Sequence, residues 1–375
     1  MDSTELNALL QRQLAGKSTL ASAFGDSSGV PILDRERIEV SAEKVSMRLR
    51  QLAIGKNVTE SQIADLEHLA VVAMNEIGSD DYTPLSLDRA VITEAVIEAD
   101  GSRPVIDIGS GGLILDDLEL GDWDSAVTGM RDEILRVADS VGRVDAPHLG
   151  AAFAGTGFAV GDHLIMTNMH VLKDKVGRQN PDGSWRVRPN STIDFGKVKG
   201  APDNPTRHFP IIEVVHMSTV VDICVLRCAP NTHQAFPAPL PFISDDASLE
   251  DGRDVFLVGF PARPRRFFAD APPPEGHERI EVIRELFRDR FGFKRISIGE
   301  ILEPPGFLGG GDKASIFSHD ASTLAGSSGS CVVDLATYGD RGVGIHYGGR
   351  SRDENRGHAL PTLRAEFEPH GVTFL

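Results

Sequence analysis

The chain has few cysteines, tryptophans and tyrosines for its length. Its 375 residues include three cysteines, two tryptophans and three tyrosines. So small and odd a number of cysteines does not suit the disulfide frameworks that hold small secreted domains together. The spacing of Cys224 and Cys228 also differs from that of the common zinc-binding pairs. We therefore expect no disulfide scaffold, no metal centre and a reducing, cytoplasmic environment.

Long apolar segments are missing as well. None reaches the roughly 20 residues that a helix needs to cross a bilayer. The N-terminal residues Met-Asp-Ser-Thr-Glu are polar and acidic, unlike the start of a secretory signal. The sequence therefore predicts a protein that acts without a membrane partner.

The chain has fewer basic than acidic residues, and this difference is distributed unevenly along the sequence. The formal net charge is −17, of which residues 1–140 carry −14 and the remaining residues −3. Proteins that bind nucleic acids usually present a basic surface to the phosphates, so we expect no nucleic-acid partner. The asymmetry predicts two domains, an acidic one over residues 1–140 and a second one over residues 141–375.

The acidic region is predicted to be mainly helical. Thr59-Glu60-Ser61-Gln62 is a capping box, followed by apolar residues at helical spacing. Further helices are expected over residues 1–24, 41–54 and 87–98, and a short strand over residues 103–108. A last helix carries the apolar stripe Trp123, Val127, Met130, Ile134, Val137 and Val141. Such a stripe favours a helix packed on its neighbour, and a partner-binding helix is the alternative.

Beyond Val144 the pattern changes to short apolar segments between glycine-rich turns, which is typical of strands. Residues 173–191 are predicted to form a polar loop, and residues 262–293 a helical insertion with a basic, proline-rich start. That basic cluster is either solvated or in contact with the acidic region. Strands are expected at residues 155–160, 163–167, 209–215, 220–227, 254–260, 294–301, 331–335, 343–347 and 358–361.

The segment Ala325-Gly326-Ser327-Ser328-Gly329-Ser330-Cys331 is the first candidate for chemistry. Its glycines permit a sharp turn with outward-facing backbone N–H groups, which suits an oxyanion hole beside a nucleophilic serine. Ser327 and Ser330 are rival nucleophiles, but the flanking glycines favour Ser328. A serine hydroxyl needs a base, usually histidine, and the histidine needs an acceptor that fixes its tautomer.

Three segments resemble the catalytic segments of trypsin-like serine proteases of the bacterial branch. They are Thr167-Asn168-Met169-His170-Val171, Asp222-Ile223-Cys224-Val225-Leu226 and Gly326-Ser327-Ser328-Gly329-Ser330. They occur in the order His, Asp, Ser that the family uses. Val255–Pro261 and Gly344–Gly349 are similar to strands of the same family. The resemblance covers residues 144–370 and implies an all-β fold of two six-stranded antiparallel barrels, here preceded by a mainly α-helical N-terminal domain.

The resemblance also implies roles for individual residues, and neither a cofactor nor a metal. Ser328 would attack the scissile carbonyl, His170 would act as base and then as acid, and Asp222 would orient His170. The backbone N–H groups of Gly326 and Ser328 would bind the oxyanion. The classical zymogens of this family hold an aspartate just before the nucleophile, where this chain has Ser327, so that activation switch is not expected in that form.

A substrate pocket follows from the same resemblance. Ser322 and Thr323 would lie at its floor, and His346, Tyr347 and Gly348 along its wall. Thr323 with His346 is similar to the staphylococcal glutamyl endopeptidases, which suggests an acidic residue at P1. A preference for small or apolar residues is the alternative, with His346 structural. His163, His216 and His319 are interpreted as structural positions.

The favoured hypothesis is a serine endopeptidase that cuts protein or peptide substrates. Residues 1–140 contain no catalytic grouping, so they are predicted to regulate the protease or to recruit a protein partner. The alternative hypothesis is a catalytically silent module that keeps the protease fold and binds peptides or partner proteins.

Overall fold

The computed structural model separates the chain into two compact units. The first comprises Met1–Val105, Asp116–Ser125 and Arg263–Phe291, and the second Ile106–Leu115, Ala126–Ala262 and Gly292–Leu375. The structure describes residues 46–47, 49–50, 53–77, 103–116, 118, 120–149, 153–202, 207–231, 234–245, 249–261, 282, 291–307, 309–323, 326–349 and 355–375. The helices expected at residues 1–24 and 87–98, and nearly all of the expected insertion, lie outside these residues.

In the first unit, helix α3 (Glu60–Ile77) begins at the predicted capping box. The Thr59 N–H donates to Gln62 Oε1 at 2.9 Å, and the Gln62 N–H donates to Thr59 Oγ1 at 3.2 Å. These reciprocal bonds satisfy two backbone donors that a helix start leaves unpaired. Ile63, Leu66 and Leu69 are buried, so the predicted apolar stripe is the packed face of the helix.

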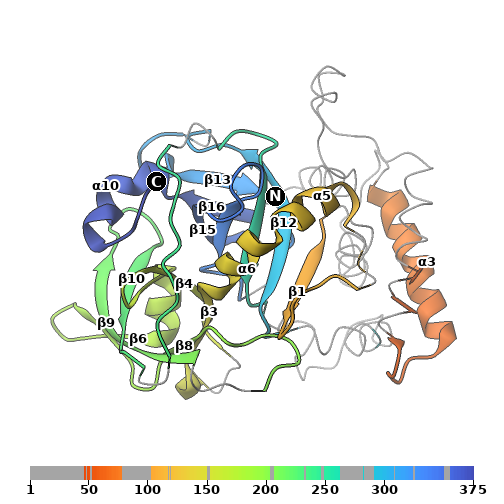
Figure 1. The fold of residues 1–375 in the computed structure, drawn as a ribbon, viewed down its shortest axis with the longest axis horizontal. Helices are drawn as coiled ribbons and strands as arrows, with labels where there is room; N and C mark the ends of the chain where they lie inside the picture. The colour runs from red at the N-terminus through yellow and green to blue at the C-terminus, as the bar shows by residue number, and fades with distance from the viewer. Residues whose placement is uncertain are drawn as a thin grey trace. The chain divides into compact units, whose positions relative to one another are not determined.

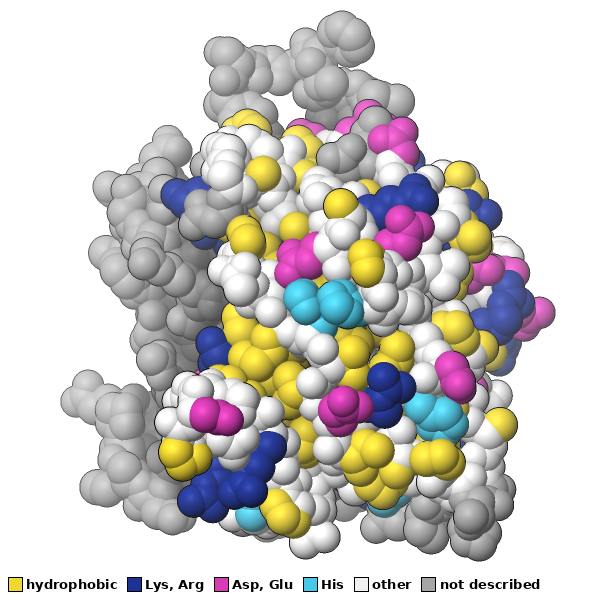
Figure 2. Space-filling view, turned by 90° about the vertical axis from the view of Figure 1, so that its left-hand side faces the viewer, with side chains coloured by type: hydrophobic (Ala, Val, Ile, Leu, Met, Phe, Trp, Pro, Cys, Tyr) yellow, Lys and Arg dark blue, Asp and Glu magenta, His cyan; other side chains and the backbone are white. Residues whose placement is uncertain are grey.

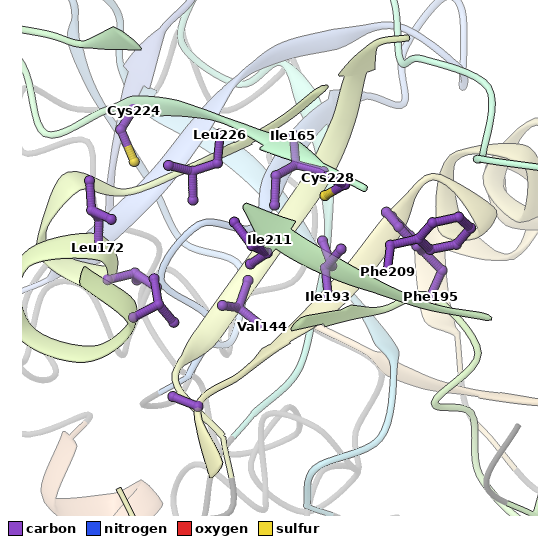
Figure 3. Close-up of a cluster of buried hydrophobic side chains, with 13 residues drawn as sticks. Val144, Ile165, Leu172, Ile193, Phe195, Phe209, Ile211, Cys224, Leu226 and Cys228 are labelled. Atoms are coloured by element: carbon purple, nitrogen blue, oxygen red, sulfur yellow. The ribbon is translucent and has the colours of Figure 1, made fainter. Parts of the chain in front are cut away.

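In the second unit, six antiparallel strands close the first barrel (Figure 1). They are β3 (Val141–Asp145), β4 (Gly155–Gly161), β5 (Leu164–Thr167), β8 (Thr192–Asp194), β9 (His208–Met217) and β10 (Cys224–Cys228), in the spatial order β10-β5-β4-β3-β8-β9. Their inward side chains form one apolar cluster that includes Val144, Ile165, Ile193, Phe209 and Leu226 (Figure 3). Strands β3 and β8 were not predicted.

The second barrel is also six-stranded, because β11 pairs with both β14 and β12 and so closes the ring. Its strands are β11 (Asp254–Gly259), β12 (Arg295–Glu303), β13 (Ile316–His319), β14 (Cys331–Asp334), β15 (Gly342–Gly349) and β16 (Asn355–Ala359). The predicted pair of barrels is therefore confirmed. The antiparallel hairpin β1 (Val105–Gly109) and β2 (Gly112–Ile114) extends this sheet beyond β12 (Figure 1).

The stripe from Trp123 to Val141 does not form one helix, and that prediction was wrong. The segment contains a 3-10 turn, η2 (Gly121–Trp123), then α5 (Asp124–Gly129) and α6 (Arg131–Asp139), and Val141 already belongs to β3. Met130 interrupts the helix with φ −111° and ψ 22°. Val127, Ile134 and Val137 are buried. The stripe therefore packs inside the chain and does not offer a partner-binding face.

The expected polar loop at residues 173–191 is more regular than predicted. A short helix α7 (Met169–Val171) leads into the π-helical turn η4 (Leu172–Val176) and the hairpin of β6 (Gly177–Gln179) and β7 (Trp185–Val187). Near the C-terminus, helix α10 (Arg364–Phe367) lies between η9 (Pro361–Leu363) and η10 (Glu368–His370). Two further 3-10 turns are η3 (Pro147–Leu149) and η8 (Gly311–Lys313).

The described surface carries charges of both signs. The face in Figure 2 shows acidic and basic side chains interspersed among hydrophobic and uncharged ones. All three cysteines are buried free thiols. Within the residues described, no helix combines the length and apolarity that crossing a membrane requires.

Candidate active site

His170 and Asp222 meet within the first barrel. His170 lies in α7, directly after β5, and Asp222 lies in the turn between β9 and β10. Asp222 Oδ2 is 2.6 Å from His170 Nδ1, and Asp222 Oδ1 accepts the His170 backbone N–H at 2.9 Å. The Asp222 carbonyl accepts the Met169 N–H at 3.2 Å and Asn168 Nδ2 at 3.0 Å. The carboxylate therefore fixes both the ring and the backbone of the histidine.

This contact determines which ring nitrogen of His170 carries the proton. An ionised carboxylate only accepts hydrogen bonds, so Nδ1 must be protonated to approach Asp222 Oδ2 at 2.6 Å. In a neutral ring Nε2 is then the unprotonated nitrogen, which is the form that a general base requires. The His170 side chain is 38% exposed, so Nε2 is not sealed off within the core.

Ser328 lies in the turn before β14 of the second barrel. We call residues 326–330 the nucleophile loop. Gly326 and Gly329 adopt φ values of 95° and 86°, which glycine reaches without the steric cost of a side chain. Of the three serines in this loop, Ser327 and Ser330 are buried, and only Ser328 is partly exposed. Ser328 therefore differs from its two rivals in being accessible to solvent.

The nucleophile loop and the His170 segment approach each other at Gly155, where β4 begins. A Cβ added at Gly155 would lie 2.9 Å from Val171 Cγ2 and 3.1 Å from the Ser328 carbonyl oxygen. Within the part of the chain that the structure describes, no hydrogen bond joins Ser328 to His170. Catalytic hydrogen bonds are often long in unliganded enzymes and tighten when substrate binds.

Of the predicted pocket residues, Ser322 and Thr323 follow strand β13, and His346, Tyr347 and Gly348 lie within strand β15 of the second barrel. His346 is buried, and its Nδ1 is 3.2 Å from Nε2 of His319. The Thr323 hydroxyl donates to Asn355 Oδ1, while Asn355 Nδ2 donates to the Ala321 carbonyl at 2.8 Å. The second bond orients the amide, so the Thr323 proton is directed to Asn355.

Three further residues of the predicted pocket are partly exposed. Ser322 precedes Thr323, and Tyr347 and Gly348 follow His346 along β15. The Tyr347 ring stacks on the His358 ring with centroids 4.4 Å apart. Three of the predicted pocket residues thus lie on β15. This strand also contacts the nucleophile loop, because the His346 carbonyl accepts the Gly329 N–H at 2.9 Å.

Comparison with known proteins gives the chain its family. Residues 155–345 match the trypsin-like peptidase domain. The chain belongs to the trypsin-like peptidases. It is accordingly a serine protease, a hydrolase whose substrates are proteins or peptides.

Relatives of this protease carry concordant names. A probable serine protease of Lysobacter enzymogenes is 28% identical over 306 residues, which span 77% of this chain and 78% of the relative. A glutamyl endopeptidase of Staphylococcus epidermidis is 25% identical over 214 residues, spanning 56% of this chain and 60% of the relative.

Solved structures with a similar chain path include two proteases. The inactive form of the Rv3671c protease of M. tuberculosis is 18% identical and covers 66% of this chain and 96% of its own, with a TM-score of 0.40. Mouse neuropsin is 11% identical and covers 63% of this chain and 95% of its own, also with a TM-score of 0.40.

Several residues of the site were not recognised from the sequence. His319, which was interpreted as structural, bonds to His346, and His358 and Asn355 contact the predicted pocket residues. Their partners lie 11 to 32 residues away along the chain. No local motif marks such contacts, and only the pairing of β15 with β16 and of β16 with β13 creates them. Among the described residues no cluster of three or more His, Cys, Asp or Glu side chains could hold a metal ion.

The histidines of the second barrel are held neutral by burial. Burial lowers the pKa of His319 to about 3 and that of His358 to about 4. Burial, and then the repulsion that a protonated His346 would meet from a protonated His319 or His170, hold the pKa of His346 well below its usual value. Protonation of these rings is thus unfavourable in the folded protease, which retains hydrogen-bonding imidazoles in place of cations.

This burial predicts that the protease loses stability in acid. The unfolded chain takes up protons on these histidines near pH 6.5, whereas the folded chain does so only at lower pH, so stability falls as the pH drops below about 7. Each such histidine contributes up to about 1.4 kcal/mol per pH unit to the decline. Urea unfolding between pH 7 and pH 5 measures it.

A pair of variants tests the assignment. H319N should flatten the decline, because it removes one titrating ring, whereas H148N should leave it unchanged, because His148 is exposed. Equal slopes for H319N and the unaltered protease would show that His319 is not the source.

Proposed function

We propose that the protein is a serine endopeptidase that works through a triad of His170, Asp222 and Ser328 and an acyl-enzyme intermediate. The observation that carries the proposal is the Asp222 carboxylate, which contacts both the ring and the backbone N–H of His170. This arrangement favours a His170 ring with Nε2 free to accept a proton. The rival nucleophiles Ser327 and Ser330 are buried, which supports Ser328.

In the proposed reaction His170 Nε2 removes the proton of Ser328 as Oγ attacks the scissile carbonyl. The backbone N–H groups of Gly326 and Ser328 stabilise the oxyanion that forms. His170 then donates its proton to the leaving amine, and the acyl-enzyme remains. Water, deprotonated by the same imidazole, attacks the ester and releases the second product. Throughout, Asp222 stabilises the charged ring of His170 without taking its proton.

Three substitutions test this mechanism. S328A, H170A and D222N should each reduce kcat for peptide hydrolysis by at least about a thousandfold, since the triad acts as a unit. S330A is the matched control in the same loop, because the Ser330 hydroxyl is buried without a hydrogen-bond partner among the described residues. It should retain activity. Undiminished hydrolysis by S328A would refute the mechanism.

The same experiment addresses the alternative function, a silent module that binds peptides through the protease fold. Such a module would bind peptides equally well before and after S328A and would hydrolyse them in neither case. The intact set of His170, Asp222 and Ser328 supports the enzyme over this alternative.

We further propose that the protease prefers an acidic residue at P1 and that His346 recognises it. Among the described residues, His319 Nδ1 is buried without a hydrogen-bond partner. An unprotonated nitrogen is the less costly form there, which places the His319 proton on Nε2, facing His346 Nδ1. His346 Nε2 then carries a proton that it can donate to a carboxylate. The glutamyl endopeptidase relative supports this preference.

A P1 library of otherwise identical peptides measures this preference. Glu should exceed Ala in kcat/KM, and H346L should reduce that ratio by about a hundredfold, because it removes a buried donor to the substrate. T323V is the control and should keep the ratio, since the Thr323 proton is already directed to Asn355. A preference for Ala or Leu in the unaltered protease would contradict the proposal and favour a small or apolar P1 residue.

Residues 1–140 are proposed to form a mainly helical region that regulates the protease or recruits a protein partner, in the cytoplasm. The support is the capped helix α3, the acidic balance of −14 and the absence of a disulfide among the three free cysteines. Because residues 106–115 belong to the unit of the barrels, the informative truncation begins at Arg103. If this region restrains the protease, a chain of residues 103–375 should hydrolyse peptides faster than the full-length chain. Equal rates on peptides and on protein substrates would contradict both roles.

A further inference from the structure

We infer that Thr156 is a positioning residue that holds the nucleophile loop in the shape needed for catalysis and makes that shape depend on the contact between the two barrels. The inference rests on the proposed role of Ser328 and adds a residue that no catalytic motif includes. Thr156 is the second residue of β4 in the first barrel, and its side chain is completely buried.

The hydroxyl of Thr156 joins two segments of the second barrel. Its Oγ1 donates to the Gly326 carbonyl at 2.9 Å and accepts the Phe260 N–H at 3.2 Å. A backbone N–H can only donate, so the contact with Phe260 directs the hydroxyl proton to Gly326. The hydroxyl therefore has a defined orientation, and both of its hydrogen bonds go to backbone groups.

The backbone of Thr156 contacts the same loop. Its N–H donates to the Ser328 carbonyl at 2.9 Å, and its carbonyl accepts Thr167 Oγ1 at 2.7 Å. A Cβ added at Gly329 would lie 2.0 Å from the Thr156 carbonyl oxygen and 2.6 Å from Thr167 Oγ1. The loop thus rests directly on β4, and only glycine fits at its closest point.

These bonds fix the peptide groups on either side of one oxyanion donor. The Gly326 carbonyl belongs to the peptide between residues 326 and 327, and the Ser328 carbonyl to the peptide between residues 328 and 329. Thr156 holds both of them. The peptide that lies between carries the Ser328 N–H, one of the two proposed oxyanion donors. Gly326, at φ 95°, has no side chain to restrict its rotation, so a bond to its carbonyl is needed to limit it.

Coupling between the barrels follows from this geometry. Thr156 belongs to the barrel that carries His170, whereas Gly326 and Ser328 belong to the barrel that supplies the nucleophile. The oxyanion site is therefore formed only when the first barrel is docked on the second. No residue of the loop is charged, so hydrogen bonds must hold it without an ion pair.

The test compares T156V, which keeps the branched shape but removes the hydroxyl, with T156S, which keeps the hydroxyl. We expect T156V to lower kcat for a short peptide substrate by between about tenfold and a hundredfold, because the donor is displaced while the binding pocket remains. KM should stay within about twofold, and a peptide boronate, which forms a tetrahedral adduct on serine, should lose affinity in parallel with kcat. T156S should recover most of the activity.

S140A is the matched control, since Ser140 is a buried residue whose hydroxyl donates to the Ala238 carbonyl at 2.8 Å, outside the nucleophile loop. It should lower Tm without changing kcat, which separates positioning from general loss of stability.

If T156V does not fold, a T156S variant with activity as low as that of T156A at equal Tm would overturn the inference. Unchanged kcat in T156V would overturn it too. Provided that S328A is inactive, either result refutes the role of Thr156 alone, whereas an active S328A refutes the proposed function itself.

Discussion

The site depends on a single carboxylate that reaches across a turn to a histidine. Asp222 directs one oxygen to His170 Nδ1 and the other to the His170 backbone N–H. The turn that carries it is itself fixed, because Ser218 Oγ accepts the N–H groups of Val220 and Val221 at 3.2 and 3.1 Å. A surface carboxylate on a mobile loop would hold an imidazole only part of the time. Here the backbone geometry limits the ring to one position and one tautomer, and a general base needs both.

The second barrel contributes buried, uncharged histidines to the site. Its histidines are buried and neutral, so they offer directional hydrogen bonds without the desolvation cost of a buried cation. In the proposed mechanism, one barrel supplies a base oriented by Asp222, and the other supplies neutral imidazole donors and a loop of backbone N–H groups. Thr156 links the two, because its hydrogen bonds connect β4 to the nucleophile loop.

Local sequence predicted the parts of this site that depend on local chemistry. The strands with continuous apolar runs, the capping box at Thr59 and the segments around His170, Asp222 and Ser328 could be identified because each has a short-range pattern. Strand β13 was missed because Ser318 and His319 make its end polar, although both are buried. The single long helix was predicted in error because Val141 continues the spacing of the stripe while belonging to β3.

Contacts between segments that are distant along the chain could not be predicted from local sequence patterns. Thr156 and Gly326 are 170 residues apart, and His319 and His346 are 27 residues apart. Only the closure of two barrels brings such pairs together, and a lone threonine or histidine in a strand looks like any other core residue until its partner is known. The roles proposed for these residues therefore rest on hydrogen bonds in the folded chain.

The proposed catalysis requires that an imidazole of the first barrel activate the Ser328 hydroxyl of the second barrel. Its most direct test is to treat the folded full-length chain with a fluorophosphonate and to locate the adduct by mass spectrometry of its peptides. We expect one adduct per chain, on Ser328, at a rate that falls sharply in H170A. An adduct on another residue, or a rate at Ser328 that does not depend on His170, would contradict it.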